Sequence, residues 1–238
     1  GEGSSRVTGI LLLDSLTQIA GLNKVNFVLE ALVKRNMLLL IIRSIKTTDE
    51  LLSLTSEDIT LDNLLYELTA FKSTVYFLIR IAETRSGAQA LIQNEIFQTI
   101  ESCSFLKIDP DLGLELVFDE VTVRNSQFVR VNLSLDNPLS LGKVNGISLF
   151  EVLVPIFQLI SSILLSMGSA NKTVIKKVRH LLVHFRKLVQ GVIKRDALIE
   201  TDEKYQIKGP TLEGLQQLVK LVVLLSTLTG YHGEETLH

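Results

Sequence analysis

The chain has 238 residues, a formal net charge of −2 and a single cysteine, Cys103. This length allows one structural unit to bury a sizeable core, and the small net charge excludes strong attraction of the whole molecule to nucleic acid or anionic membranes. One cysteine excludes an intrachain disulfide and fits a reducing compartment. Hydrophobic residues make up 46% of the chain but aromatic ones only 6%, a balance typical of a membrane protein or of helices buried on several sides.

Apolar residues recur at helical spacing through most of the first hundred residues. A corner is expected where one helix passes to the next, at "TRSGAQAL" (84–91), and Asn94 is expected to separate the two short helices that follow. The predicted helical segments are residues 6–20, 24–45, 50–54, 60–81, 86–91 and 95–102.

The corner sequence "TRSGA" (84–88) has the residue types of a phosphate-binding loop. Such a loop needs several glycines, so that backbone amides converge, followed by a lysine and a hydroxyl. This stretch has one glycine and no such lysine, and "LGKVNG" (141–146) has Val144 where Ser or Thr is needed. We therefore predict that Gly87, with Ala88 and Ala90, lets two helices approach closely.

Residues 106–145 interrupt the helical pattern. Asp109-Pro110 and Asn137-Pro138 bracket a stretch that alternates with a period of two in places. A hairpin turning at Asn125-Ser126 fits this alternation, although the turn lacks the glycine that hairpins favour. We predict a non-helical or short hairpin insertion here.

The helical pattern resumes at Ser148, where Ser148 and Glu151 have the spacing of a capping box. The run from 147 to 167 is the longest apolar stretch of the chain. A membrane-spanning helix needs ~20 mostly apolar residues, so this run is either a core helix or a membrane span. We favour a core helix and expect no transmembrane segment, because Glu151, Gln158 and Pro155 interrupt the run.

A single amphipathic helix is predicted over 172–198, with its apolar residues on one arc. Eight cations, with no acid between them, share the opposite arc. They form either a solvated face or a surface for an acidic partner, RNA or a membrane. No aromatic residues interleave the cations, so nucleic-acid binding is not expected. This candidate basic surface consists of Lys172, Lys176, Lys177, Arg179, Arg186, Lys187, Lys194 and Arg195.

The last predicted helix begins after Gly209-Pro210 and ends at Gly230. Its segment "LVKLVVLLSTL" (218–228) is apolar nearly all round. At the end of a stack no successor covers its far side, so the helix either tucks inward or offers an apolar groove to a partner's helix. The candidate partner-binding residues are Gln217, Lys220, Leu221, Leu224, Leu228 and Tyr231.

No group of residues predicts an enzyme. His180 and His184 have the spacing of two ligands to one metal, but Leu181 stands where zinc proteases have glutamate, and no third ligand follows. Cys103, beside Glu101, lacks the electropositive surroundings of a nucleophilic thiol. We expect no cofactor, no metal and no small-molecule substrate.

About eight helices, several apolar around most of their circumference, predict an all-α protein. A helix in the middle of a stack is covered on two sides, so we favour an irregular α-solenoid of stacked antiparallel helix pairs, similar to HEAT and armadillo repeats. A compact bundle is the second architecture.

Three parts of the chain together resemble one protein family. They are "FVLEALVKRNMLLLIIRSI" (27–45), "FLIRIAETRSGAQALIQNEIFQTI" (77–100), and "LFEVLVPIFQLISSILLSMG" with "VRHLLVHFRKLVQGVIK" (149–168 and 178–194). In order and spacing they resemble the carboxy-terminal tail of the nucleoporin 192/205 family, the largest inner-ring scaffold nucleoporins of the nuclear pore complex, in a form that looks fungal. Residues 106–145 fit least well and resemble a lineage-specific insertion.

The resemblance implies a non-catalytic scaffold of the nuclear pore complex, in the nucleus at the nuclear envelope, serving nucleocytoplasmic and mRNA transport. It implies that residues 1–238 form one helical tail module of a longer solenoid. It also implies that other nucleoporins are the partners, chiefly the inner-ring linker nucleoporin, captured through a short helix of its flexible N-terminal region. A karyopherin-like transport receptor or adaptor is the alternative.

Overall fold

The structure is a computed structural model that describes residues 26–53, 61–107, 115–117, 146–203 and 210–233. The helix predicted over 6–20, the hairpin turn at Asn125-Ser126 and most of "LGKVNG" lie outside these described residues. The same holds for residues 54–60, between the second and third helices.

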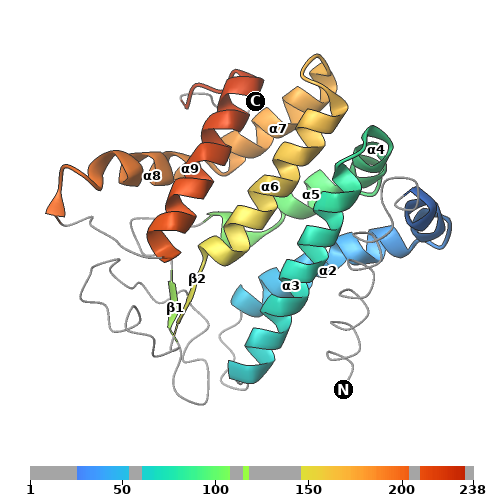
Figure 1. Cartoon of the computed structure of the whole chain (residues 1–238), viewed down its shortest axis with the longest axis horizontal. Coiled ribbons are helices and arrows are strands. Elements are labelled where there is room, and N and C mark those ends of the chain that lie inside the picture. Colours follow the sequence, from blue (N-terminus) through green and yellow to red (C-terminus); the bar gives the residue numbers. More distant parts are fainter. Residues whose placement is uncertain (1–25, 54–60, 108–114, 118–145, 204–209, 234–238) are drawn as a thin grey trace.

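The helices form two rows (Figure 1). A short helix, α4 (Arg85–Gln93), connects the rows at a corner. The front row contains α3 (Leu61–Ala82), α6 (Phe150–Met167) and α9 (Pro210–Thr229). The second row contains α2 (Met37–Ser53), α5 (Ile96–Glu101), α7 (Lys172–His184) and α8 (Arg186–Leu198).

The three front-row helices run in the same direction. Near their ends, the Ser166 hydroxyl of α6 donates a hydrogen bond to the Ala82 carbonyl of α3. Near their beginnings, a Cβ added to Gly214 of α9 would lie 2.6 Å from the Cβ of Phe150 of α6. Helices that return to the same direction after each crossing to a second row have the arrangement of a solenoid. The predicted all-α solenoid is therefore confirmed.

Helix α6 is the centre of the core. It lies between α3 and α9, and Glu151 and Leu165 are the only residues of this helix that are exposed. Of its 18 residues, 67% are buried inside the protein. The apolar run that the sequence left open between a core helix and a membrane span is thus a core helix in this fold.

The start of α6 differs from the prediction. Ser148 belongs to a short strand, β2 (Gly146–Ser148), which pairs antiparallel with β1 (Glu115–Val117), so that Glu115 lies opposite Ser148. The residue that precedes the helix is Leu149, and no side chain caps it. The predicted capping box is wrong, because the helix begins one residue later than predicted and Leu149 takes the capping position. The strand pair joins residues 115–117, which lie inside the predicted insertion, to the residues that directly follow it.

The single helix predicted over 172–198 is also wrong. It is divided at Phe185, whose backbone leaves the helical region at φ −101° and ψ 28° while its side chain is buried. The division lets α7 pack against α5 and α6 while α8 packs against the short 3₁₀ helix η1 (Ser104–Lys107). Both halves also contact α9. Burial of each half against different neighbours outweighs continuation of one straight helix.

The boundaries near the N-terminal side shift for a similar local reason. Residues 26–34 are helical, and α2 then runs unbroken to Ser53. The predicted helix end at 45 and the separate segment predicted to start at 50 are therefore wrong. The break falls at Asn36, which takes a left-handed conformation with φ 55°, one that asparagine tolerates better than most residues. Thr48 and Asp49 continue the helix and are buried in it.

The corner at residues 84–91 is confirmed. The Thr84 hydroxyl accepts a hydrogen bond from the Gly87 amide at 3.0 Å and caps the start of α4. A Cβ at Gly87 would lie 1.8 Å from the Ile81 carbonyl oxygen, a backbone atom that cannot swing away. Glycine is therefore required here by the approach of α4 to the end of α3.

We expect Gly87→Ala to lower the free energy of unfolding by about 3 kcal/mol, because the added methyl group forces the backbone of α3 and α4 apart. Urea denaturation followed by circular dichroism measures this loss. Gln89→Ala, at an exposed position of the same helix, is the matched control and should change stability by less than about 0.5 kcal/mol. Equal stability of the two variants would contradict the close approach.

Candidate functional site

Helix α9 is the last helix of the front row. Neighbouring helices α6, α7 and α8 pack against it (Figure 1). Both α6 and residues 212–229 of α9 are long and apolar enough to cross a membrane by length and composition, but only 39% of that α9 segment is buried inside the protein, against 67% for α6. Helix α9 therefore has more residues outside the core than α6 does, and two of these, Val223 and Leu224, are apolar.

The six residues predicted to bind a partner differ in exposure. Gln217, Lys220 and Leu224 are exposed, with 37% of Leu224 accessible. Leu221 and Leu228 are half-buried and pack against the core, and Tyr231 is buried. Sequence reasoning missed Val223, which is more exposed than Leu224 at 49%.

Leu221 and Leu228 lie on the side of α9 that faces α6, and Leu224 lies on its outer edge. Gly214 marks this side, because it contacts Phe150 of α6. Leu221 and Leu228 follow Gly214 at seven-residue intervals, which is close to two helical turns and keeps them on the same side. Val223 lies nine residues after Gly214, half a turn away in angle, so it occupies the opposite flank.

An outer seam between α6 and α9 results from this arrangement. The two helices run in the same direction and are level at Phe150 and Gly214. Equal rise along each helix then places Leu165, the exposed apolar residue of α6, near the level of Leu228. Leu165, Leu224 and Leu228 make this seam the apolar part of the outer surface near the end of α9.

The end of α9 is fastened to α7. The Arg179 Nε donates to the Thr229 carbonyl at 2.8 Å, and its terminal nitrogen donates to the same oxygen. Gly230 follows with φ 69°, and the Tyr231 amide donates to the Ser226 carbonyl at 3.0 Å. The last carbonyls of a helix have no partner within the helix. A cation can donate to them, and a glycine in the left-handed conformation lets the following backbone amide donate to them. The predicted end at Gly230 is confirmed, and Arg179 has a structural role.

The predicted basic surface is divided in two. Arg195 is buried, with 4% of its surface accessible, so its inclusion is wrong. The break at Phe185 explains this, because the arc calculated for one continuous helix does not pass unchanged from α7 to α8. The exposed cations are Lys172, Lys176 and Lys177 on α7, and Arg186, Lys187 and Lys194 on α8.

His180 and His184 both approach one carboxylate. The Glu101 Oε1 of α5 lies 3.1 Å from His180 Nε2 and 3.8 Å from His184 Nδ1. Within the described part of the chain, no group of three or more histidine, cysteine or acidic side chains could hold a metal ion. The two histidines therefore connect α7 to α5.

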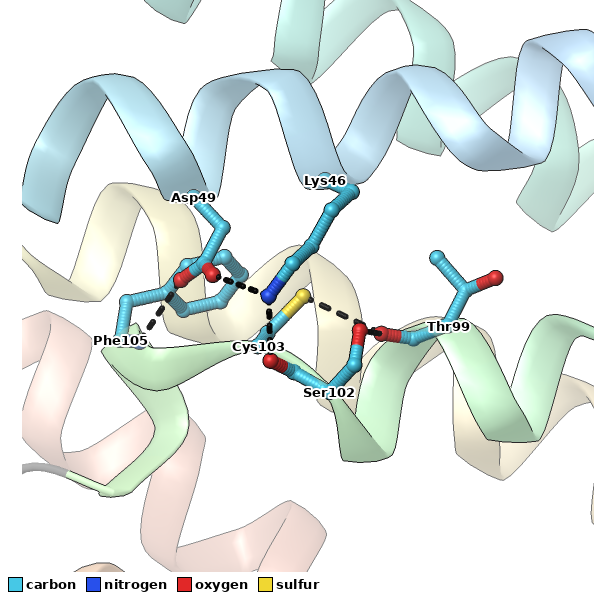
Figure 2. A network of polar contacts seen from close by, with 6 residues as sticks. All are labelled: Lys46, Asp49, Thr99, Ser102, Cys103 and Phe105. Atoms are coloured by element: carbon cyan, nitrogen blue, oxygen red, sulfur yellow. Dashed lines mark hydrogen bonds and ion pairs between the residues drawn. The ribbon is translucent and has the colours of Figure 1, made fainter.

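A buried polar network ties α2 to the turn after α5 (Figure 2). Asp49 Oδ2 accepts from Lys46 Nζ at 2.9 Å, and Oδ1 accepts from the Phe105 amide at 2.9 Å. Lys46 also donates to the Ser102 carbonyl. The Asp49 carboxylate thus fixes the first turn of η1 on α2. Nothing in the local sequence pattern distinguishes this aspartate from a surface acid.

Cys103 lies in the same network as an unreactive thiol. Its Sγ donates to the Thr99 carbonyl at 3.3 Å and its side chain is inaccessible. Burial, and then the nearby Asp49 carboxylate, raises the pKa of this thiol from 9.0 to about 12. A thiolate is the reactive form of cysteine, so the folded protein keeps Cys103 inert at neutral pH.

We expect Cys103 in the native protein to resist alkylation by iodoacetamide at pH 8, because the pKa of about 12 leaves almost none of the thiol ionised. The same thiol should react readily after unfolding in urea, when its pKa returns towards its ordinary value. Mass spectrometry measures the labelled fraction. Ser102→Cys, one residue away at an exposed position, should label quickly in the folded state, and equally fast labelling of the native chain would refute the burial.

Comparison with known proteins matches the chain to a family. The model of the nuclear pore complex scaffold family, nucleoporins 186/192/205, matches residues 1–229. No individual curated protein matches the chain. The family match agrees with the resemblance seen in the sequence, whereas the expected fungal form stays a prediction.

Proposed function

Because the chain belongs to the nuclear pore complex scaffold family, nucleoporins 186/192/205, we propose that its last helix captures a short helical segment of another nucleoporin. Membership makes the chain a structural scaffold of the nuclear pore complex at the nuclear envelope and implies interaction with other nucleoporins. The family is a scaffold family, not an enzyme family.

The observation that supports the proposal is the outer seam between α6 and α9. An amphipathic helix lying along this seam would bury Leu224 and complete the cover of Leu221 and Leu228. Exposed Leu165 on α6 would extend the contact. Apolar burial contributes roughly 25 cal/mol per Å², from which the cost of ordering both partners is subtracted.

Polar residues at the rim would set the register of the bound helix. Gln217 and Lys220 are exposed on α9, about two turns and one turn before Leu224 respectively. An acidic residue of the partner facing Lys220 would favour one orientation over its reverse, since charged rims act more on specificity than on affinity. Buried Tyr231 would support the end of the seam from below.

The partner that fits best is the flexible N-terminal region of the inner-ring linker nucleoporin. The resemblance to the family's carboxy-terminal tail supports this finer assignment, with residues 1–238 as one tail module of a longer solenoid. The alternative, a karyopherin-like receptor, would instead bind phenylalanine-glycine segments.

We expect Leu224→Glu to weaken binding of linker-nucleoporin peptides by at least about tenfold, because a carboxylate in the seam loses its water when the peptide docks. Fluorescence anisotropy with labelled peptides that tile the N-terminal region of the linker nucleoporin measures the affinity. The same titration with phenylalanine-glycine peptides should show no binding.

The matched control is Val223→Glu, which adds the same charge at a similarly exposed position on the opposite flank. This variant should bind like the unmodified chain, and circular dichroism should show both variants fully helical. If Val223→Glu abolishes binding while Leu224→Glu does not, the partner uses the flank turned away from α6. Binding of phenylalanine-glycine peptides alone would favour the receptor.

A further inference from the structure

A groove between α5 and α7 leads to a second assignment that does not depend on the first. The groove has a volume of about 360 Å³ and lies in the second row of helices, whereas the seam on α9 belongs to the front row. We propose that this groove docks a short acidic peptide segment of another protein chain, with one apolar side chain as its anchor.

The floor of the groove is apolar. Phe97 of α5 and Leu181 of α7 line it, and both are otherwise buried in the core. Gln98 and Thr173 form part of its polar edge. Phe97 and Leu181 are only 5% and 2% accessible. An apolar side chain entering between the helices would therefore contact their accessible edges and the aliphatic stems of Lys176 and Lys177, and water would leave these surfaces. Pockets of this size are large enough for small ligands or a few side chains.

The rim carries positive charge that the described structure does not neutralise. Lys176 and Lys177 are exposed and line the groove, and neither makes an ion pair with any described residue. Lys172 lies one turn earlier on the same helix and is also exposed. The lining also holds one acid, Glu101 on the opposite wall, 3.1 Å from His180, so the two lysines exceed the acids among the described lining residues. Acidic side chains of a docked segment would complement the two lysines.

The neighbouring groove, between α2 and α5, has about 430 Å³ but a different charge balance. Its cations are paired within the protein: Arg43 lies 3.4 Å from Glu95, and Lys46 lies 2.9 Å from Asp49. The acid Glu50 also lines that groove, so among its described residues no cation is left without an acidic partner. The contrast assigns the docking site to the α5–α7 groove.

A peptide fits the α5–α7 groove better than a nucleic acid. Base stacking needs the exposed face of an aromatic ring. Of the two rings in the lining, Phe97 is only 5% accessible, and the exposed His180 has its Nε2 3.1 Å from the Glu101 carboxylate. An aliphatic or aromatic side chain of a peptide would cover the apolar part of the groove lining, whereas a phosphate backbone would leave it exposed to water.

The test uses the whole chain and two labelled synthetic peptides. One peptide carries a single leucine among glutamates, and the other has each glutamate replaced by lysine. Fluorescence anisotropy should show binding of the acidic peptide only. Lys176→Glu combined with Lys177→Glu should weaken this binding by at least about tenfold, which corresponds to the loss of about 1.4 kcal/mol.

Two controls separate the groove from general charge attraction. Arg186→Glu combined with Lys187→Glu makes the same change in net charge at exposed positions of α8 and should leave binding unchanged. Leu224→Glu should also leave binding unchanged, so failure of this proposal is distinguishable from failure of the α9 proposal. An environment-sensitive dye on Thr173→Cys should respond to the acidic peptide, because Thr173 is exposed and lines this groove but not the α2–α5 groove.

Three results would overturn the assignment. The first is absence of binding by the acidic peptide at millimolar concentration. The second is equal weakening by the α7 and α8 charge reversals, which would indicate general attraction. The third is displacement of the peptide by an oligouridylate at physiological salt, which would indicate that this surface binds nucleic acid.

Discussion

The structure depends on covering α6, a helix that is apolar on nearly every side. Such a helix is stable in water only when neighbours enclose it, since each apolar side chain left exposed loses the favourable free energy of burial. Helices α3 and α9 flank α6 in the front row, α4 and α7 also contact it, and α5 lies in the second row (Figure 1). The two-row arrangement follows from this requirement. So does the small residue at each closest approach, Gly87 at the α3–α4 corner and Gly214 where α9 meets Phe150.

How much the sequence predicts depends on whether the signal is local. The glycine corner at 84–91 and the helix end at Gly230 are set by residues a few positions apart, and both are confirmed. The break at Phe185 was missed, because it follows from what α7 and α8 pack against, which is distant in the chain. The capping box at Ser148 failed for the same reason, since its competitor is a strand pair with residues more than thirty positions earlier.

The candidate site was predicted less well than the fold. Periodicity identified α9 as a helix with apolar surface, but not the position of α6 beside it, so the choice of side needed the contact of Gly214 with Phe150. Charge counting placed Arg179 and Arg195 on a surface, whereas one caps the end of α9 and the other is buried. Asp49 and Lys46, which hold the turn after α5, carry no pattern that separates them from solvated charges.

The bonds from Arg179 to the Thr229 carbonyl have a mechanical consequence. A partner bound along α9 that is pulled along the helix axis loads that helix in shear. The guanidinium transmits part of this force to α7, fifty residues earlier in the chain. The last helix is therefore anchored to α7 in the second row and does not separate from the protein as a free end.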